Sequence, residues 1–391
     1  METTKKKDEQ KDELDKLLAD KNTHRLVIKA RLQPVGYNPD TGECARFQPA
    51  GFPEIGHVIY DAPIVKKDKD GKLMLDDEKQ PIHATQKICI IDSAASMANH
   101  LEKVMWDETA CELQPDLAHL PYIRLELTED GKEAIFATSS ILQDHRIASS
   151  YFLDAMCKEP EGKKFIDYLF EQGKFEATAG RSFIPPTKRK DILNTLFNHD
   201  PNSLLHGVFF PQKKLGNFKL ARMLTASLEA IGADRVSSAG VKFDPIGKKH
   251  AKDTNYGQSI FQKEDDVATN IVATFVIDLD LLRSFGLDPN KNRLLVELAA
   301  WKIRRLLAHP KLRTSCFLSL KKLWLHANDE EKQSDLIETW ANSVSKDIKE
   351  VFPHGKAFVV TSLKKEVLDS AGQDDEEDEE KATTPAPEGT P

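Results

Sequence analysis

The 391-residue sequence has no long apolar run and no apolar segment near its start. No stretch approaches the ~20 apolar residues that a membrane-spanning helix needs. Residues 1–21 are rich in lysine, aspartate and glutamate, so we expect no secretory signal. The two absences predict a soluble, cytoplasmic protein that has no membrane partner.

Cysteine is scarce and scattered. The five cysteines are Cys44, Cys89, Cys111, Cys157 and Cys316. No two of them have the close spacing of a structural zinc site, and their odd number argues against a disulfide framework. We expect a reducing cytoplasmic setting and no metal.

Catalytic sequence motifs are also missing. The chain has no G-x-x-x-x-G-K-[ST] or G-x-G-x-x-G loop, no H-E-x-x-H and no nucleophile elbow;. Its histidines and acidic residues do not cluster at metal-ligand spacing. The sequence therefore predicts neither an enzyme nor a cofactor.

Negative charge is concentrated at one end of the chain. The net charge is −8, but residues 370–391 contain eight acidic residues and one lysine, which leaves −1 on the preceding 369 residues. A nearly neutral body can carry local basic patches. The acidic total thus does not exclude a nucleic-acid partner.

Strict alternation marks residues 25–35 as a half-buried strand. Leu26, Ile28 and Ala30 would face the core, with Lys29 and Arg31 on the other face;. That basic face is either solvated or a platform for nucleic-acid phosphates.

The middle of the chain is interpreted as a strand followed by a helix. The apolar run Leu204–Phe210 has the length of a buried strand. Residues 217–231 carry apolar side chains at Leu220, Leu224, Leu228 and Ile231, which is the spacing of one helical face;. Gly232 would end that helix.

A projecting arm is predicted next. Residues 236–243 favour a strand, residues 244–266 are polar and basic, and residues 267–277 favour a returning strand;. A carboxylate at the base of the arm, Asp244, could assist cleavage of a bound RNA, which is a minor alternative.

The remaining pattern mixes helices and strands, which predicts an α+β class. Ser139 or Thr138 would begin a helix with His145 and Arg146 in its middle, and Asp92 or Ser93 would cap another;. The other expected elements are strands at 87–91, 121–127, 134–137 and 356–361 and helices at 165–170, 294–307 and 329–351.

Two loops separate these elements. In the first, residues 36–56, Arg46 and Gln48 flank Phe47 and either present a guanidinium and an amide to a ligand or only pack over a sheet edge;. The second, residues 61–84, is rich in lysine and aspartate and is expected to be flexible.

Several stretches, taken in order, resemble a known family. They are RFQPAGFPEIG at 46–56, SMANHLE at 96–102, LPYIR at 120–124, TSSIL at 138–142, LHGVF at 205–209 and SSAGVK at 237–242. They resemble the CRISPR-associated backbone subunits of the RAMP superfamily (the Cas seven group), and most closely the type I-G branch, formerly called I-U. The resemblance covers roughly residues 25–325. The sequence departs from the family in two ways: it has Ser-Ala-Gly-Val-Lys where a second glycine is expected, and its acidic tail is an extra.

The resemblance implies a modified ferredoxin-like (RRM-like) palm sheet with helical finger insertions and a projecting β-hairpin thumb. It implies copies stacked head to tail into a filament along a CRISPR guide RNA, in an antiviral Cascade that finds target DNA through the guide. A separate helicase-nuclease and other Cascade subunits would be partners, and the chain itself would not be catalytic. The domain limits would be a charged arm at 1–21, one domain at 22–365 with its thumb at about 240–268, and an acidic disordered tail at 366–391.

The resemblance also implies RNA contacts that are mostly to the backbone, since a guide-holding protein must accept any spacer sequence. The expected contacts are Arg46, Gln48, Ser96, Asn99, His100, His145, Arg146, Ser238, Lys242, Phe243, Lys248 and Lys249. Two alternatives stay open: a ribonuclease of the same superfamily that cuts target RNA with Asp244, and a protein–protein interaction subunit without nucleic acid.

Overall fold

The computed structural model describes residues 13–38, 40, 45–52, 55–129, 132–178, 181–183, 188–243 and 258–363. Within these ranges helices alternate with mostly antiparallel strands, which confirms the α+β class. The chain divides into two compact units. Unit 1 comprises Met1–Leu101, Leu224–Leu279 and Ala299–Ala341, and unit 2 comprises Glu102–Met223, Asp280–Leu298 and Asn342–Pro391.

Unit 1 is built on an eight-stranded antiparallel sheet in the order β17-β18-β1-β16-β13-β3-β2, with β19 paired to β18. Its strands are β1 (Arg25–Pro34), β2 (Ile59–Val65), β3 (His83–Asp92), β13 (Leu224–Ile231), β16 (Asn270–Asp278), β17 (Lys311–Arg313), β18 (Cys316–Ala327) and β19 (Glu330–Lys332).

One face of this sheet is the core of the unit. In β1 the residues Leu26, Ile28 and Ala30 are fully buried, whereas Lys29 and Arg31 are exposed. Because side chains alternate across a strand, this confirms the half-buried strand predicted at residues 25–35.

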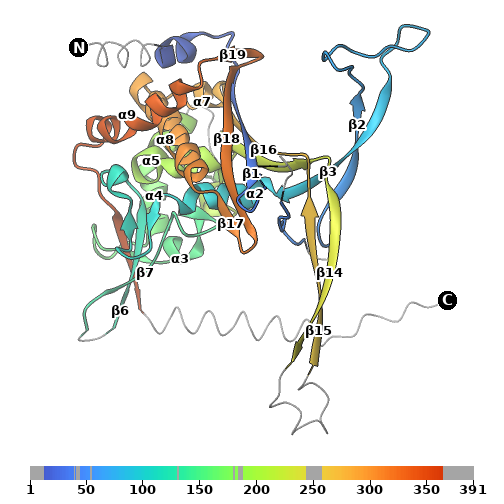
Figure 1. Cartoon of the computed structure of the whole chain (residues 1–391). Coiled ribbons are helices and arrows are strands. Elements are labelled where there is room, and N and C mark those ends of the chain that lie inside the picture. The colour runs from blue at the N-terminus through green and yellow to red at the C-terminus, as the bar shows by residue number, and fades with distance from the viewer. Residues whose placement is uncertain are drawn as a thin grey trace, which may run out of the picture. The chain divides into compact units, whose positions relative to one another are not determined.

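A two-stranded ribbon extends from the sheet (Figure 1). It is formed by β14 (Asp234–Phe243) and β15 (Gln258–Val267), which pair in continuous antiparallel register. The ribbon lies between β13 and β16 in the chain, where the sequence predicts the arm. Residues 244–257, which include Asp244, Lys248 and Lys249, lie outside the described residues.

A second hairpin, β2–β3, replaces most of the expected loop at residues 61–84. Beyond the paired strands, Asp68 Oδ1 accepts hydrogen bonds from the amides of Asp70 and Lys72. The Asp76 carboxylate forms the same kind of turn at Glu78 and Gln80. The aspartates that made this stretch look like a loop are therefore the turn formers of an extended hairpin.

Unit 2 contains a four-stranded sheet in the order β7-β6-β20-β8, in which β20 and β6 are parallel. The strands of this sheet are β6 (Ile123–Thr128), β7 (Ile135–Ser139), β8 (Met156–Cys157) and β20 (Phe358–Leu363). Three two-stranded sheets in the described part of unit 2 are formed by β4 (Trp106–Asp107) with β5 (Glu112–Leu113), β9 (Glu176–Thr178) with β10 (Arg181–Phe183), and β11 (Val208–Phe209) with β12 (Lys219–Leu220).

The helices belong to both parts of the chain. They are α2 (Ala94–Lys103), α3 (Ser150–Leu153), α4 (Phe165–Gln172), α5 (Arg189–His199), α6 (Pro201–His206), α7 (Leu279–Ser284), α8 (Pro289–Ala308) and α9 (Asp335–Val351), with 3-10 turns at Pro115–Leu117, Arg146–Ala148 and Lys213–Leu215. None of the helices in the described part of the chain is both long and apolar enough to cross a bilayer.

Three expected elements are wrong. The apolar run at 204–210 is the end of helix α6 followed by the short strand β11, and the helix expected from Ser139 is a turn, a 3-10 segment and the four-residue α3. The helix expected at 217–231 is mainly strand β13, in which alternate residues from Leu224 to Ala230 are buried. A spacing of four residues suits either period, because it is one helical turn and also a multiple of two. Gly232, with a φ of 65°, ends this strand and not a helix.

Candidate nucleic-acid interface

The loop that carries Arg46 is bound to the base of the β14–β15 ribbon. The amide of Phe47 donates to the carbonyl of Asp266 at 2.9 Å, and the Asp266 amide donates back at 2.8 Å. The Phe47 side chain is buried. The main-chain amide of Gln48 donates to the carbonyl of Ser315. This bond joins the same loop to the turn between β17 and β18. Phe47 is therefore a packing residue that holds its neighbours in place.

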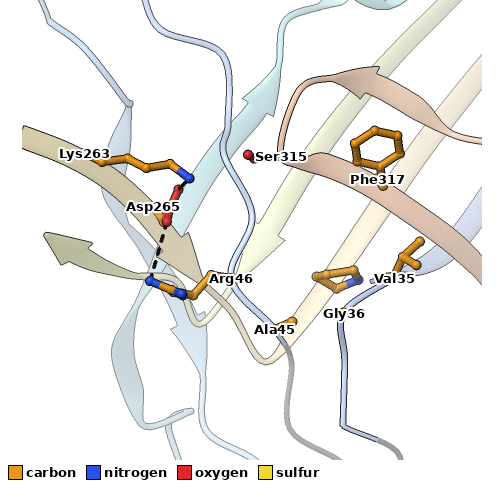
Figure 2. A pocket seen from close by; sticks show the side chains of 9 residues that line it. Val35, Gly36, Ala45, Arg46, Lys263, Asp265, Ser315 and Phe317 are labelled. Carbon is orange, nitrogen blue, oxygen red and sulfur yellow. Dashed lines mark ion pairs between the residues drawn. The ribbon is translucent and has the colours of Figure 1, made fainter. Parts of the chain in front are cut away.

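A hollow of about 650 Å³ lies beside this loop. Figure 2 shows the guanidinium of Arg46 and the ammonium of Lys263 directed toward Asp265, with Val35 and Phe317 on the other side of the hollow. Phe317 and Val35 are large apolar side chains that stay 44% and 65% exposed. The hollow thus has one charged wall and one apolar wall.

Two cations share one carboxylate in the charged wall. Arg46 Nη1 lies 3.7 Å from Asp265 Oδ2, and Lys263 Nζ lies 3.3 Å from Asp265 Oδ1. The Asp265 side chain is 6% exposed, whereas that of Arg46 is 59% exposed. One buried negative charge therefore orients two outward positive charges, which favours an anionic ligand at this place.

The adjacent Asp266 fixes the ribbon from its other side. Its Oδ2 lies 2.9 Å from Nδ1 of His57, and its carboxylate is fully buried. Burial raises the pKa of Asp266, against the opposing effects of His57 and the Arg235 charge. Arg235, on β14, also donates to the carbonyl of His57 at 2.8 Å. The two aspartates point to opposite sides of β15, so one faces the hollow and the other anchors the strand.

Helix α2 begins beside a third buried carboxylate, that of Asp92. Ser93 Oγ accepts the Ser96 amide at 3.2 Å, which confirms the predicted cap;. Asp92 Oδ2 accepts from His100 Nε2 at 3.1 Å and from Arg313 Nη2 at 2.6 Å. Burial by itself would raise the pKa of Asp92, but the hydrogen bonds from His100 and Ser96 and the charge of Arg313 outweigh it and lower the pKa.

Two groups of predicted RNA contacts in unit 1 lie outside the ribbon, one on α2 and one on the loop that carries Arg46. Ser96 and His100 are half-buried against Asp92, whereas Asn99 on the same helix is exposed. Arg46 is exposed at the hollow and Gln48 is half-buried. Arg313 links the groups, because it binds Asp92 and lies two residues before the Ser315 carbonyl that holds Gln48.

Two further predicted contacts, His145 and Arg146, lie in unit 2. His145 is exposed. Arg146 is buried and binds Glu102 through two hydrogen bonds, Nε to Oε1 at 2.6 Å and Nη2 to Oε2 at 2.7 Å. The structure thus gives Arg146 a carboxylate partner inside the protein, and an RNA contact through Arg146 stays a prediction.

The contacts predicted on the ribbon are placed only in part. Ser238, Lys242 and Phe243 lie in β14. Only the course of the backbone is described there, and Lys248 and Lys249 lie outside the described residues. These assignments stay predictions.

Sequence analysis missed Lys263, Arg313 and Phe317. No sequence pattern singled out Phe317, because the residues of β18 alternate between buried and less buried positions only at the two ends of the strand;. Arg313 carried no signal either, because it binds Asp92, a carboxylate distant in sequence. Lys263 pairs with Asp265 only two residues later, in the segment that sequence analysis assigned to the projecting arm.

The described residues contain no group of three or more His, Cys, Asp or Glu side chains that could hold a metal ion. The buried thiol of Cys89 lies near Asp266, and burial raises its pKa to about 12. A thiol with this pKa stays protonated at neutral pH and is a poor nucleophile. The charged side chains and the Phe317 ring around the hollow can form ion pairs and stacking contacts.

Comparison with known proteins identifies the class and the family. A family model for CRISPR-associated proteins, described as "CRISPR-associated protein GSU0053", matches residues 26–235. The match spans more than half of the 391 residues. The chain therefore belongs to the CRISPR-associated protein GSU0053 family.

Other comparisons are less informative. No curated protein matches the chain. A chain of a solved structure described as "CRISPR RNA-guided surveillance complex, pre-nicking" is 12% identical, with a TM-score of 0.31, over 84% of this chain and 89% of that chain. A TM-score of this size does not establish a shared fold.

Proposed function

We propose that this protein is a non-catalytic backbone subunit that binds CRISPR guide RNA in an antiviral effector complex of the Cascade type. Copies would stack head to tail along the guide, which would locate matching DNA by base pairing. Other subunits and a helicase-nuclease would complete the complex in the cytoplasm. A head-to-tail contact uses two different surfaces, so it extends a filament without closing a dimer.

The observation that carries the proposal is the pair of outward cations at the base of the ribbon. Arg46 and Lys263 flank Asp265 beside the hollow, on a chain of a CRISPR-associated family. Charge-assisted contacts of this kind hold phosphates and carry no sequence information. A guide-holding subunit needs such contacts, because its guide varies in sequence.

The strand order supports the finer assignment to the RAMP superfamily. Strands β1, β13, β16 and β18 occur in this order along the chain; α2 is among the elements between the first two, and α8 is among those between the last two. In the sheet they lie in the order β18-β1-β16-β13. We interpret this order as the β-α-β-β-α-β pattern of a ferredoxin-like palm, in which the β14–β15 ribbon inserted between β13 and β16 would be the thumb. The type I-G subtype rests on the sequence resemblance alone.

Co-expression with a CRISPR array and its processing subunit tests the proposal. We expect the purified protein to carry nuclease-protected RNA of guide length in particles larger than a monomer. The double variant Arg46→Glu with Lys263→Glu should lose most of that RNA. Lys346→Glu, which reverses a 73% exposed charge on α9, is the matched control.

A nucleic-acid-free monomer from the wild type would contradict the proposal and favour the interaction-subunit alternative. The ribonuclease alternative makes a different prediction. Loaded particles would cut a complementary RNA in the presence of a divalent metal, and Asp244→Ala would abolish the cut.

A further inference from the structure

The sheet of unit 1 has a second face that no predicted guide contact on α2 or the ribbon uses. On β1 this face carries Lys29 and Arg31, and on β18 it carries Lys322 and Trp324. Lys29 pairs with Trp324, and Arg31 pairs with Lys322. Directly paired residues point to the same side of a sheet. The three cations are exposed and the indole is half-buried.

This face continues to the hollow beside Arg46. A bulge after Arg31 shifts the register, and Gln33 then pairs with Ser319. The amide of Val35 donates to the carbonyl of Phe317 at 2.9 Å. Both side chains line the hollow (Figure 2). Two aromatic rings therefore mark the ends of one track, seven residues apart on β18, which is about 20 Å along a strand.

Lysines lie over both rings. Lys322 Nζ is 4.8 Å from the centroid of the Trp324 ring, and Lys311 Nζ is 5.3 Å from that of Phe317. A flexible lysine leaves a ring face easily, since an exposed cation–π contact is worth only about 0.5–1 kcal/mol. Each ring can therefore exchange its lysine for a flat ligand while the ammonium moves to a nearby anion.

The two strands of the track carry charge of one sign, whereas β19 on the other side of β18 places the exposed Glu331 opposite His326 on the same face;. Neither β1 (RLVIKARLQP) nor β18 (CFLSLKKLWLHA) contains an acidic residue. The adjacent strand β16 places Val272 and Thr274 beside Arg31 and Lys29. On the next strand Glu229 accepts a hydrogen bond from Tyr60 at 3.3 Å, at the far side from β18. A ligand on the track thus meets cations and rings with no opposing carboxylate on its own two strands.

We propose that the outer face of β1 and β18, which we call the β1–β18 track, binds single-stranded nucleic acid. Lys29, Arg31 and Lys322 contact phosphates. Trp324 and Phe317 stack on bases. A basic groove with aromatic rings is how proteins hold single strands without sequence preference. The identity of the strand, the guide RNA or a DNA strand of the target, rests on the proposed function, whereas the binding chemistry does not.

Binding of the purified full-length chain to labelled oligouridylate and oligothymidylate tests the track. We expect Trp324→Leu to weaken binding of both by about tenfold, because the apolar side chain is kept and the stacking surface is lost. Trp324→Phe should bind within about threefold of the wild type. Tyr151→Leu, at a 43% exposed ring in unit 2, is the matched control and should bind as the wild type does.

Salt dependence tests the cations separately. For single strands the logarithm of the binding constant falls with a slope of about 0.7 per neutralised phosphate. Lys29→Gln with Lys322→Gln should therefore lower the slope by about 1.4. Lys346→Gln should leave it unchanged.

Particles loaded by co-expression show whether the track binds the guide RNA or a DNA strand of the target. Loss of guide RNA from the track variants assigns the track to the guide. Normal guide content with weakened binding of matching DNA assigns it to DNA. Equal affinities and slopes for track and control variants overturn the inference, even if guide RNA co-purifies normally. Track-dependent binding by a chain that never retains guide RNA supports the track and contradicts the proposed function.

Discussion

At the scale of single residues, three side-chain hydrogen bonds in unit 2 converge on the buried Glu102. Arg146 donates two hydrogen bonds to it, and Asn202 Nδ2 donates a third at 2.7 Å. All three side chains are buried. Arg146 holds a φ of 54°, a backbone conformation that side chains other than glycine rarely adopt;. The ion pair is thus maintained at some backbone cost.

Removal of this cation should destabilise the protein without any RNA present. We expect Arg146→Met to lower the free energy of unfolding by about 3–5 kcal/mol, because Glu102 would remain as an unpaired buried charge. Urea unfolding measures the effect. Adding Glu102→Gln to Arg146→Met should restore part of the loss. Unchanged stability of Arg146→Met would contradict a stabilising role for the ion pair with Glu102.

Asp200 predicts a pH dependence at the same scale. Burial raises the pKa of this fully buried carboxyl from 3.8 to about 6. The folded protein therefore holds the proton of Asp200 more tightly than the unfolded chain does. Ionisation of Asp200 lowers the free energy of unfolding as pH rises from about 4 to 6, and the loss is greatest and constant above pH 6. Two pKa units correspond to about 3 kcal/mol.

The variant Asp200→Asn should remove this dependence. We expect it to gain stability over the wild type progressively between pH 4 and 6 and to keep that gain at neutral pH. Urea unfolding across this range measures it, with Asp154→Asn at an exposed position as the control. A constant difference between variant and wild type across the range would contradict the assignment.

At the scale of elements, the β14–β15 ribbon depends on its base. Pairing of Phe47 with Asp266 and the contact of His57 with the Asp266 carboxylate connect β15 to the preceding loop. Cα partners pair along the whole described length of the ribbon, but two strands alone are marginally stable in water. We therefore expect the carboxylate of Asp266 to contribute to the stability of the ribbon.

We expect Asp266→Ala to lower the free energy of unfolding by about 1–3 kcal/mol, because His57 would lose its buried hydrogen-bond partner. Hydrogen exchange at the Phe47 amide should accelerate, because that amide donates to residue 266;. Asp68→Ala is the control, and it should affect only the amides of Asp70 and Lys72 in the β2–β3 turn. Unaltered exchange at Phe47 in Asp266→Ala would show that the main-chain hydrogen bonds between residues 47 and 266 are stable without the Asp266 carboxylate.

At the scale of the whole molecule, the acidic stretch at residues 370–391 carries most of the net negative charge. Deletion of residues 370–391 changes the net charge from −8 to −1. We expect the truncated chain to bind oligonucleotides more tightly at low salt, because repulsion of the phosphates is reduced. Above about 0.5 M salt the two proteins should converge, since the Debye length falls below ~5 Å.

Oligonucleotide titrations of both proteins at several salt concentrations measure this effect. A full-length variant with the eight acidic residues replaced by their amides is the control, and it should match the truncation. Equal affinities at low salt would exclude an electrostatic role for this stretch.

Periodicity alone determined the strands and helices with one unambiguous pattern. Residues 25–35 alternate strictly, and residues 294–307 repeat as a helix does, so both were predicted. Residues 217–231 carried leucines four apart, which suits both periods, and their identity as strand β13 was decided by pairing with β16 and β3. The CRISPR-associated class was also accessible from the sequence, since it depends on short stretches in a fixed order.

Only the tertiary structure decided which side chains share a site. Arg46, Lys263 and Asp265 are joined by a loop that pairs with a strand more than two hundred residues later, and no local pattern encodes such a pairing. Arg146 was a plausible RNA contact in sequence, and burial beside Glu102 gave it a partner within the protein. The alternation of β1 showed that Lys29 and Arg31 share a face, but only the register with β18 placed Trp324 and Lys322 beside them. Local spacing determines which way a side chain points, whereas what it meets there depends on contacts between distant parts of the chain.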